Sequence, residues 1–329
     1  MNRIVEICGT GIGLPARVVT SLEIDRTQGY PEGHTERISG VVSRYYAGTE
    51  TASELAAEAA RGALARAGVE PDAVDCIIAA SGTMEQAIPC NAAHIHARLG
   101  LARPIPAFDV NMTCLSALLA IDMASSMLAG GVYRTILICS SDIPSVGVRW
   151  DDIAVGGMFG DGAAALVLSA GGRSGMCIRA SRFETHTEGL EYCQIRGGGS
   201  RCHPTRIAGD YAAYGLFEMQ GKELFKLTAQ VIAPFLARLL ADAGLELAEI
   251  DWIVPHQASK LGIQHIQKRL SFDEAKMINI FAHRGNQVAA SLPSALHELL
   301  ASGRTKEGDR VLLIGTSAGL SLGAMILEL

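Results

Sequence analysis

One pattern occurs twice in the chain, as LARAGVEPDAVDCIIAASGT (64–83) and as LADAGLELAEIDWIVPHQAS (240–259), 176 residues apart. In both copies a helical stretch ends at a glycine, and an aspartate then precedes a continuously apolar segment that is typical of a buried strand. A second pair repeats at the same offset, because RTILICSS begins at Arg134 and RVLLIGTS begins at Arg310. Two matches at one offset predict an internal duplication.

The duplication divides the chain into halves at residues 1–170 and 171–329. Each half alternates helical and strand patterns, so the predicted class is α/β with buried sheets. Residues 171–215 carry no long periodic pattern, and we expect a loop there, either a lid over a site or a surface excursion. We expect a turn at GTGIG (9–13) rather than a phosphate-binding loop, because Leu14 stands where GxGxxG needs its third glycine.

The composition excludes several classes of protein. The 329 residues are 49% hydrophobic, which excludes a disordered chain. The net charge is −6 without a basic block, so no nucleic-acid partner is expected. No apolar run suggests a membrane span, and the N-terminus is not a signal peptide. Eight scattered cysteines then indicate reduced thiols in a cytoplasmic protein. No metal site is predicted, because Cys90, His94 and His96 do not share one helix face.

The segment AFDVNMTCLSALLAIDMASSMLAGG (107–131) contains the first candidate for chemistry. A short apolar strand leads to Cys114, and an almost wholly apolar helix follows and ends at two glycines. The unpaired N–H groups of a helix N-terminus favour a thiolate, so we expect the pKa of Cys114 to fall from about 8.5 to about 7. A buried core cysteine is the alternative.

Two polar residues of the second half complete a candidate site. His256 directly follows an apolar strand, and function concentrates at the carboxyl ends of strands in α/β sheets. Asn286 precedes a helix of small residues, and at the offset of 176 it falls opposite Val110, with Ala290 opposite Cys114. Two related halves are expected to bring these helix starts together across a pseudo-two-fold axis, so that a cysteine, a histidine and an asparagine share one pocket.

The sequence resembles the ketoacyl-acyl-carrier-protein synthase III family of the thiolase superfamily over nearly its whole length. The resemblance rests on five motifs in order, which are DVNMTCLSAL around Cys114, FGDGAAALVL (159–168), VPHQAS around His256, RGNQVAASLPSAL around Asn286 and GTSAGLSLG (315–323). It implies a thiolase-like five-layered α-β-α-β-α fold, usually assembled as a homodimer, and the duplication agrees with that fold.

The resemblance also implies a reaction. Cys114 would take the acyl group from acyl-CoA or an acyl-acyl-carrier protein as a thioester. Malonyl-acyl-carrier protein would then lose carbon dioxide, while His256 and Asn286 donate hydrogen bonds to the enolate. The backbone N–H groups of Cys114 and Ala318 would hold the second oxyanion. No cofactor is implied, and the product is a 3-oxoacyl thioester of fatty-acid or polyketide-type synthesis.

Four further positions carry weaker implications of the same resemblance. Ile88 would reach across the dimer interface into the partner's acyl pocket, and an ordinary interface side chain is the alternative. Lys226, Lys268 and Arg269 would dock an acidic acyl carrier protein. Solvated helix charges are the alternative for these three residues.

The chain departs from the family pattern at four places. His34 and Ile38 replace a tryptophan and an arginine that hold coenzyme A in the family, and Ile153 replaces a second arginine. Ser259 stands where the family has an asparagine. These departures favour an acyl-carrier-protein donor and a specialised enzyme. A cysteine-dependent acyltransferase that forms no carbon–carbon bond and a non-catalytic carrier-binding subunit are the rival functions.

Overall fold

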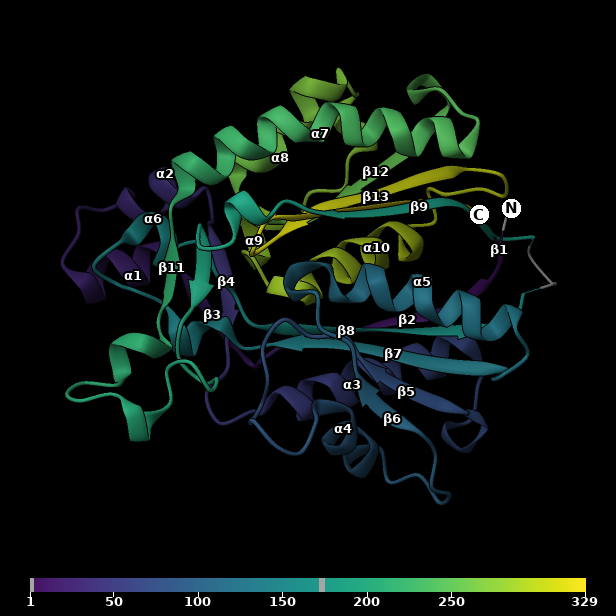
Figure 1. The fold of residues 1–329 in the computed structure, drawn as a ribbon, viewed down its shortest axis with the longest axis horizontal. Coiled ribbons are helices and arrows are strands. Elements are labelled where there is room, and N and C mark those ends of the chain that lie inside the picture. Colours follow the sequence, from purple (N-terminus) through teal and green to yellow (C-terminus); the bar gives the residue numbers. More distant parts are fainter. Residues whose placement is uncertain (1–2, 172–174) are drawn as a thin grey trace.

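The computed structural model describes residues 3–171 and 175–329, and their helices and sheets stack in five layers. Two mixed sheets enclose a central helix layer, and further helices cover the outer face of each sheet (Figure 1). The central helices are α5 (Ser116–Ala129) and α10 (Ser291–Ala301). The predicted α-β-α-β-α architecture is therefore confirmed.

Each large sheet has five strands. In order across the first sheet these are β2 (Glu6–Gly13), β8 (Gly162–Ser169), β7 (Thr135–Asp142), β5 (Cys76–Ala79) and β6 (Ala107–Asp109). The second sheet consists of β1 (Arg3–Ile4), β9 (Cys177–Thr185), β14 (Ser321–Glu328), β13 (Arg310–Ser317) and β12 (Trp252–Pro255). Two small sheets pair β3 (Arg17–Thr20) with β4 (Ser43–Tyr46), and β10 (Cys193–Ile195) with β11 (Phe217–Met219).

The outer layers consist of longer helices, and shorter helices complete the fold. The layer below the first sheet is α3 (Ala52–Ala67) and α4 (Asn91–Leu99), and the layer above the second is α7 (Gly221–Ala243) and α8 (Lys260–Leu270) (Figure 1). The shorter helices are α1 (Ser21–Gln28), α2 (His34–Ser39), α6 (Ile153–Gly156) and α9 (Phe281–Arg284).

The duplication is visible in matching hydrogen bonds, but its register changes by one residue along the chain. Strands β5 and β12 begin 176 residues apart, as predicted, whereas β7 and β13 begin 175 apart. The backbone N–H of Asp75 donates to the carbonyl of Thr135 at 2.9 Å, and that of Asp251 donates in the same way to Arg310 at 2.9 Å. Arg134 is therefore not the counterpart of Arg310, and that part of the predicted alignment is wrong by one residue.

The loop expected at 171–215 is the clearest error about the fold. Residues Cys177–Thr185 form β9, which pairs with β14 over most of its length. Arg179, Arg182 and Glu184 interrupt its apolar residues, so the segment lacks the continuous apolar run of the other inner strands. Strand β1 pairs with β9 and so joins the second sheet from the N-terminal end of the chain. The division at residue 170 stays a prediction.

The GTGIG segment is part of strand β2 and not the expected turn. A Cβ atom on Gly9 would lie 2.2 Å from the carbonyl oxygen of Ala63, and one on Gly11 would lie 2.1 Å from that of Ala59. The glycines therefore let helix α3 press its backbone against the strand. This close packing explains the motif without any ligand.

Helix α7 is, among the described helices, the one long and apolar enough to cross a membrane, so the expectation that no such run exists was too strict. Length and composition alone are weak evidence, because core helices pass the same test. In this fold the buried side chains of α7 pack into the core cluster beside the second sheet, and they are Ile232, Phe235, Leu236 and Leu239.

Candidate functional site

Cys114 lies in a short 3-10 helix, η2 (Thr113–Leu115), between strand β6 and helix α5. Thr113 has φ of +48°, which is a strained conformation for a β-branched residue. The hydroxyl of Ser116 holds this turn, because it accepts from Met112 N at 2.8 Å and donates to the carbonyl of Thr113 at 2.7 Å. The turn therefore presents the thiol at the N-terminus of α5, as the sequence predicts.

The backbone N–H groups of Cys114 and Ala318 lie close enough to the sulfur of Cys114 to favour its thiolate form. Ala318 follows strand β13, so the second half of the chain contacts the nucleophile directly. Even so, burial, together with a smaller effect of the charge of Asp142, raises the pKa of Cys114 to about 12. The expected lowering to about 7 is therefore wrong, because desolvation outweighs the helix terminus and the two N–H donors.

His256 follows strand β12 and is almost fully buried. Its backbone N–H donates to the carbonyl of Ile314 at 2.8 Å, which extends the β12–β13 pairing by one residue. A Cβ atom on Gly315 would lie 2.7 Å from the Cβ of His256 and 3.2 Å from a methyl of Leu115, so this glycine lets the two residues approach each other. Burial lowers the pKa of His256 to about 4, and the imidazole is therefore neutral at physiological pH.

Asn286 is buried at the end of a short β-bridge to Phe159. Its amide Nδ2 donates to the carbonyl of Ala258 at 3.2 Å, and Ala258 is two residues beyond His256. Its Oδ1 accepts from Val288 N at 2.9 Å. The carboxamide is thus fixed relative to the segment that carries the imidazole, and one N–H of its amide has no protein partner among the described residues.

These contacts bring the three predicted side chains into one region. Cys114 is joined to the second half through Ala318, and the next residue, Leu115, packs beside His256. Asn286 is joined to the His256 segment through Ala258. The site therefore combines a partly exposed thiol with a buried neutral imidazole and a buried carboxamide.

The two helix starts are duplicates of one turn, with an offset of 175. Val288 has φ of +52°, like Thr113, and lies in the matching 3-10 helix η9 (Val288–Ala290). Asn111 Oδ1 accepts from Thr113 N at 2.8 Å, as Asn286 Oδ1 does from Val288. The counterpart of Asn286 is therefore Asn111, and not Val110 as predicted.

The same offset places Ala289 opposite Cys114. The predicted pairing of Cys114 with Ala290 is thus one residue too far along the chain. The error arises because the register changes between β5 and η2, where sequence matching had no anchor.

Two residues near the nucleophile were not anticipated. Asp142, the last residue of β7, is fully buried, and its charge acts on Cys114. Cys193, in β10, is also buried and lies within electrostatic range of Cys114. Asp142 could have been found, because it directly follows a buried strand in the same way as His256. No sequence signal distinguishes Cys193, and all eight cysteines are free thiols.

Ile88 has an exposed side chain, with 83% of its surface accessible in the single chain. Met84, four residues earlier in the chain, is also exposed. An isoleucine and a methionine so close together on the surface are typical of a contact with another chain. Whether Ile88 enters a partner's acyl pocket stays a prediction.

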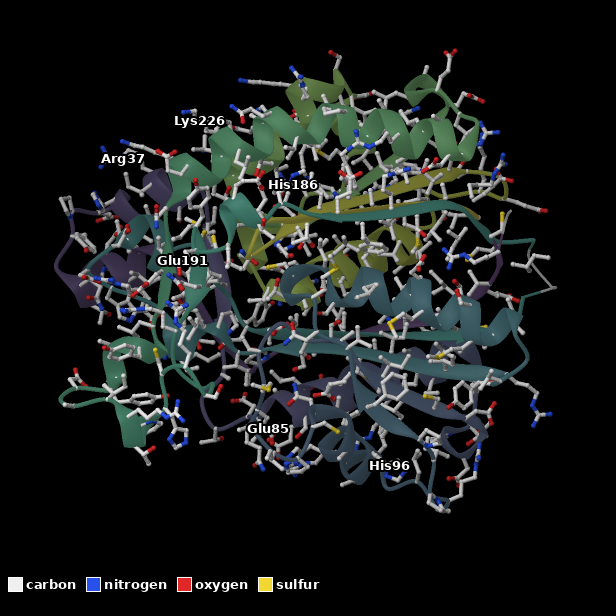
Figure 2. All side chains as sticks on the ribbon, viewed as in Figure 1. Arg37, Glu85, His96, His186, Glu191 and Lys226 are labelled. Carbon is white, nitrogen blue, oxygen red and sulfur yellow. The ribbon has the colours of Figure 1, made fainter. Side chains whose placement is uncertain are left out.

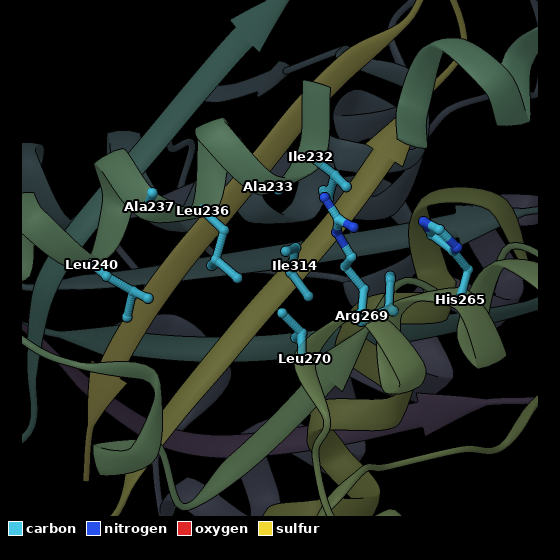
Figure 3. A pocket seen from close by; sticks show the side chains of 10 residues that line it. Ile232, Ala233, Leu236, Ala237, Leu240, His265, Arg269, Leu270 and Ile314 are labelled. Carbon is cyan, nitrogen blue, oxygen red and sulfur yellow. The ribbon is translucent and has the colours of Figure 1, made fainter. Parts of the chain in front are cut away.

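The three predicted docking cations lie on the outer helices and are exposed. Figure 2 shows Lys226 at the periphery of the molecule. Lys268 lies on α8, and Arg269 follows it. Figure 3 shows Arg269 and His265 beside an apolar cavity of about 190 Å³ between α7 and α8. Their role in docking stays a prediction.

The family departures have structural consequences. His34 stacks on Tyr30, with ring centroids 4.8 Å apart, and its Nδ1 lies 3.0 Å from an Arg37 nitrogen. Ile38 is largely exposed, whereas Ile153 packs against a small apolar cluster. None of these three positions offers a cation of its own to a phosphate.

Ser259 caps helix α8 by accepting from Gly262 N at 3.1 Å. No hydrogen bond joins this hydroxyl to Asn286 in the described part of the chain, and the carbonyl of Ala258 holds the carboxamide instead. The described residues also hold no cluster of three or more histidine, cysteine or acidic side chains suited to a metal ion.

Comparison with known proteins gives one consistent family. Residues 108–188 match 3-oxoacyl-[acyl-carrier-protein] synthase III, and residues 240–329 match its C-terminal region. Residues 40–142 match the N-terminal domain of thiolase. The site residues of both halves fall inside these ranges.

Relatives match over the full length. The chain is 34% identical to the beta-ketoacyl-[acyl-carrier-protein] synthase III of Rhodospirillum centenum over 326 residues, which cover 98% of each chain. It is also 34% identical to a Streptomyces coelicolor protein named beta-ketoacyl-[acyl-carrier-protein] synthase III 3, over 99% of this chain and 98% of that one. The crystal structure of the 3-oxoacyl-[acyl-carrier-protein] synthase III of Aquifex aeolicus superimposes with a TM-score of 0.87 at 28% identity, over 100% of both chains.

Proposed function

Since the chain belongs to the 3-oxoacyl-[acyl-carrier-protein] synthase III family, we propose that it is an acyltransferase that condenses an acyl thioester with malonyl-acyl-carrier protein. The observation that carries this proposal is the thiol of Cys114, faced by two backbone N–H groups and accompanied by neutral His256 and Asn286. The product is a 3-oxoacyl thioester for fatty-acid or polyketide-type synthesis.

In the first step Cys114 takes the acyl group from its donor. The sulfur forms a bond to the thioester carbonyl, the carbon–sulfur bond to the donor breaks, and the thiol proton leaves with the donor sulfur. A pKa of about 12 for Cys114 and about 4 for His256 means that both groups are neutral at rest. The proton must therefore be transferred as the sulfur attacks, and the N–H groups of Cys114 and Ala318 stabilise the oxyanion that forms.

In the second step the malonyl thioester loses carbon dioxide and becomes an enolate. Neutral His256 and the free N–H of Asn286 donate to the enolate oxygen, and each preorganised donor of this kind contributes about 2.7–4 kcal/mol. The enolate carbon then attacks the acyl carbonyl, and the bond to the Cys114 sulfur breaks. One proton from solvent restores the thiol, so carbon and charge balance without a cofactor.

The acyl carrier protein is the partner that the relatives' names specify, and we extend it to this chain. Its acidic surface fits Lys226, Lys268 and Arg269, which are exposed on α7 and α8. A homodimer would cover Ile88, and that side chain would then help to set the acyl length. The enzyme would act in the cytoplasm, where its cysteines stay reduced.

The acyl donor follows from the departures around His34, Ile38 and Ile153. Because none of these side chains supplies the arginines of the family pattern, an acyl-carrier-protein donor is favoured over acyl-CoA. Arg37, which touches His34, is a cation that could compensate.

Intact-protein mass spectrometry against a panel of acyl-CoA and acyl-carrier-protein donors tests the proposal. We expect an acyl adduct on the wild-type chain, none on Cys114→Ala, and carbon dioxide release once malonyl-acyl-carrier protein is added. Acylation without carbon dioxide release would indicate an acyltransferase that forms no carbon–carbon bond. The absence of any adduct would indicate a non-catalytic carrier-binding subunit.

A further inference from the structure

Asp142 is a buried carboxylate that the proposed reaction does not use. Its Oδ1 accepts from Gly82 N at 2.9 Å, from Thr83 N at 2.7 Å and from the Thr83 hydroxyl at 2.7 Å. Its Oδ2 accepts from Ala289 N at 3.1 Å. No cation in residues 3–171 or 175–329 pairs with it, so four hydrogen bonds hold the charge.

The bond to Ala289 reaches the turn that carries Asn286. The middle of this turn is Val288, which has φ of +52° although it is β-branched. A conformation of this kind costs about 1–3 kcal/mol and persists only where neighbours enforce it. Two consecutive backbone N–H groups are held here, that of Val288 by Asn286 Oδ1 and that of Ala289 by Asp142.

The bonds to Gly82 and Thr83 fix a third segment between the two catalytic turns. A Cβ atom on Gly82 would lie 2.5 Å from a methyl of Val288 and 3.3 Å from the backbone carbon of Thr113. The glycine therefore fits between the turn before Cys114 and the turn after Asn286. One carboxylate oxygen of Asp142 binds the Gly82–Thr83 segment, and the other binds the turn that carries Asn286.

The charge of Asp142 distinguishes two possible roles for this carboxylate, activation of Cys114 and positioning of Asn286. Burial raises the pKa of Asp142 to about 6, so it is mostly ionised at neutral pH. Its negative charge raises the pKa of Cys114 and so opposes formation of the thiolate. Asp142 therefore does not activate the nucleophile, and its hydrogen bonds hold the Gly82–Thr83 segment and, through Ala289 N, the turn that carries Asn286.

We propose that Asp142 is a positioning residue for the condensation step. It fixes the position of the Asn286 carboxamide relative to Cys114 through its hydrogen bond to Ala289 and through the Gly82–Thr83 segment. This role rests on the proposed function. It predicts that loss of the carboxylate impairs decarboxylation much more than acylation.

The test is Asp142→Asn, which keeps the shape of the side chain. An amide has one acceptor oxygen, so either Ala289 N or the Gly82–Thr83 donors must face an NH₂ group. We expect carbon dioxide release from malonyl-acyl-carrier protein to fall about 10- to 100-fold, because small misplacements in a site cost this much. Acylation of Cys114 by the donor found in the mass-spectrometry panel should stay within about 3-fold, and its alkylation by iodoacetamide should become faster as the negative charge is removed.

Asp309→Asn is the matched control. Asp309 is also buried and accepts from Trp252 Nε1 at 2.8 Å, but it precedes β13 at the opposite end from the site. This variant should lose stability without changing the ratio of the two rates. If Asp142→Asn does not fold, Thr83→Val removes one donor to the same carboxylate and should reduce condensation alone, to a smaller extent.

Equal losses of acylation and condensation in Asp142→Asn, or no loss in either, would overturn the role of Asp142 while leaving the proposed function intact. A wild-type chain that is acylated but releases no carbon dioxide would overturn both. Slower alkylation of Cys114 in Asp142→Asn would also contradict the proposal, because it would mean that the carboxylate supports the nucleophile.

Discussion

Replacement of Asn286 by alanine tests whether this residue acts in condensation and not in acylation. The carboxamide is buried, and one of its two N–H groups donates to Ala258 O at 3.2 Å. The other is the donor that the enolate would use. Loss of one preorganised donor costs about 2.7–4 kcal/mol, which is about 10²- to 10³-fold in rate.

The expected loss of rate is confined to decarboxylation and condensation. Acylation uses the N–H groups of Cys114 and Ala318 and should stay within a few-fold of the wild type. Carbon dioxide release from malonyl-acyl-carrier protein, followed by rapid quench on the pre-acylated enzyme, should fall by the full factor. The variant also leaves Val288 N without its acceptor, so the free energy of unfolding should fall by about 1–3 kcal/mol.

Asn279→Ala is the control for that structural effect. Asn279 Oδ1 accepts from Phe281 N at 3.1 Å in a similar local bond, and its side chain is exposed. Both rates should be unchanged in this variant. Loss of acylation in Asn286→Ala with decarboxylation preserved would refute the assigned roles.

Three further predictions concern the rest of the site and the surface. Burial disfavours the charged form of His256 and lowers its pKa to about 4, so His256 should not titrate in the condensation rate between about pH 5 and 8. Burial raises the pKa of Asp142 to about 6, so a fall in the rate near pH 6 is expected from Asp142 and should disappear in Asp142→Asn; a titration near pH 6.5 that persists in this variant would contradict the assignment. Ile88→Trp should shorten the longest acyl chain that Cys114 accepts, as read from the mass-spectrometry panel, if a dimer places this side chain in the partner's pocket. Lys226→Glu with Lys268→Glu should lower kcat/KM for malonyl-acyl-carrier protein on the order of 10-fold at low salt, with acylation by acyl-CoA unaffected.

The site residues that could be predicted from the sequence are those whose position leaves a local pattern. The place of Cys114 before an apolar helix and of His256 after an apolar strand could be read directly, because a strand end and a helix start each leave a local signature. Strand β9 was missed because most of its residues are half-buried and three of them, Arg179, Arg182 and Glu184, are charged. A segment of this kind becomes a strand through its pairing with β14, which no local pattern reveals.

The pKa of Cys114 was predicted in the wrong direction for a related reason. A helix terminus can be recognised in sequence, whereas desolvation depends on residues that pack from elsewhere. Asp142 and Cys193 lie far from Cys114 in the chain, and both raise its pKa. The sign of the shift is therefore set by tertiary packing, which the sequence pattern around Cys114 does not contain.

The duplication explains why the two catalytic turns look alike and act differently. At an offset of 175, Cys114 corresponds to Ala289 and Asp142 corresponds to Ser317, the residue before Ala318. In one direction the end of β13 donates the N–H of Ala318 to the turn of Cys114, and in the other the end of β7 accepts the N–H of Ala289 from the turn of Asn286. The two cross-contacts lie one residue apart in register and have opposite polarity, with a donor needed beside the acyl oxyanion and an acceptor needed where the Asn286 turn must be fixed. Exchanging the hydrogen-bond donor for an acceptor at the end of β13, or the acceptor for a donor at the end of β7, should therefore affect one step of the reaction and spare the other.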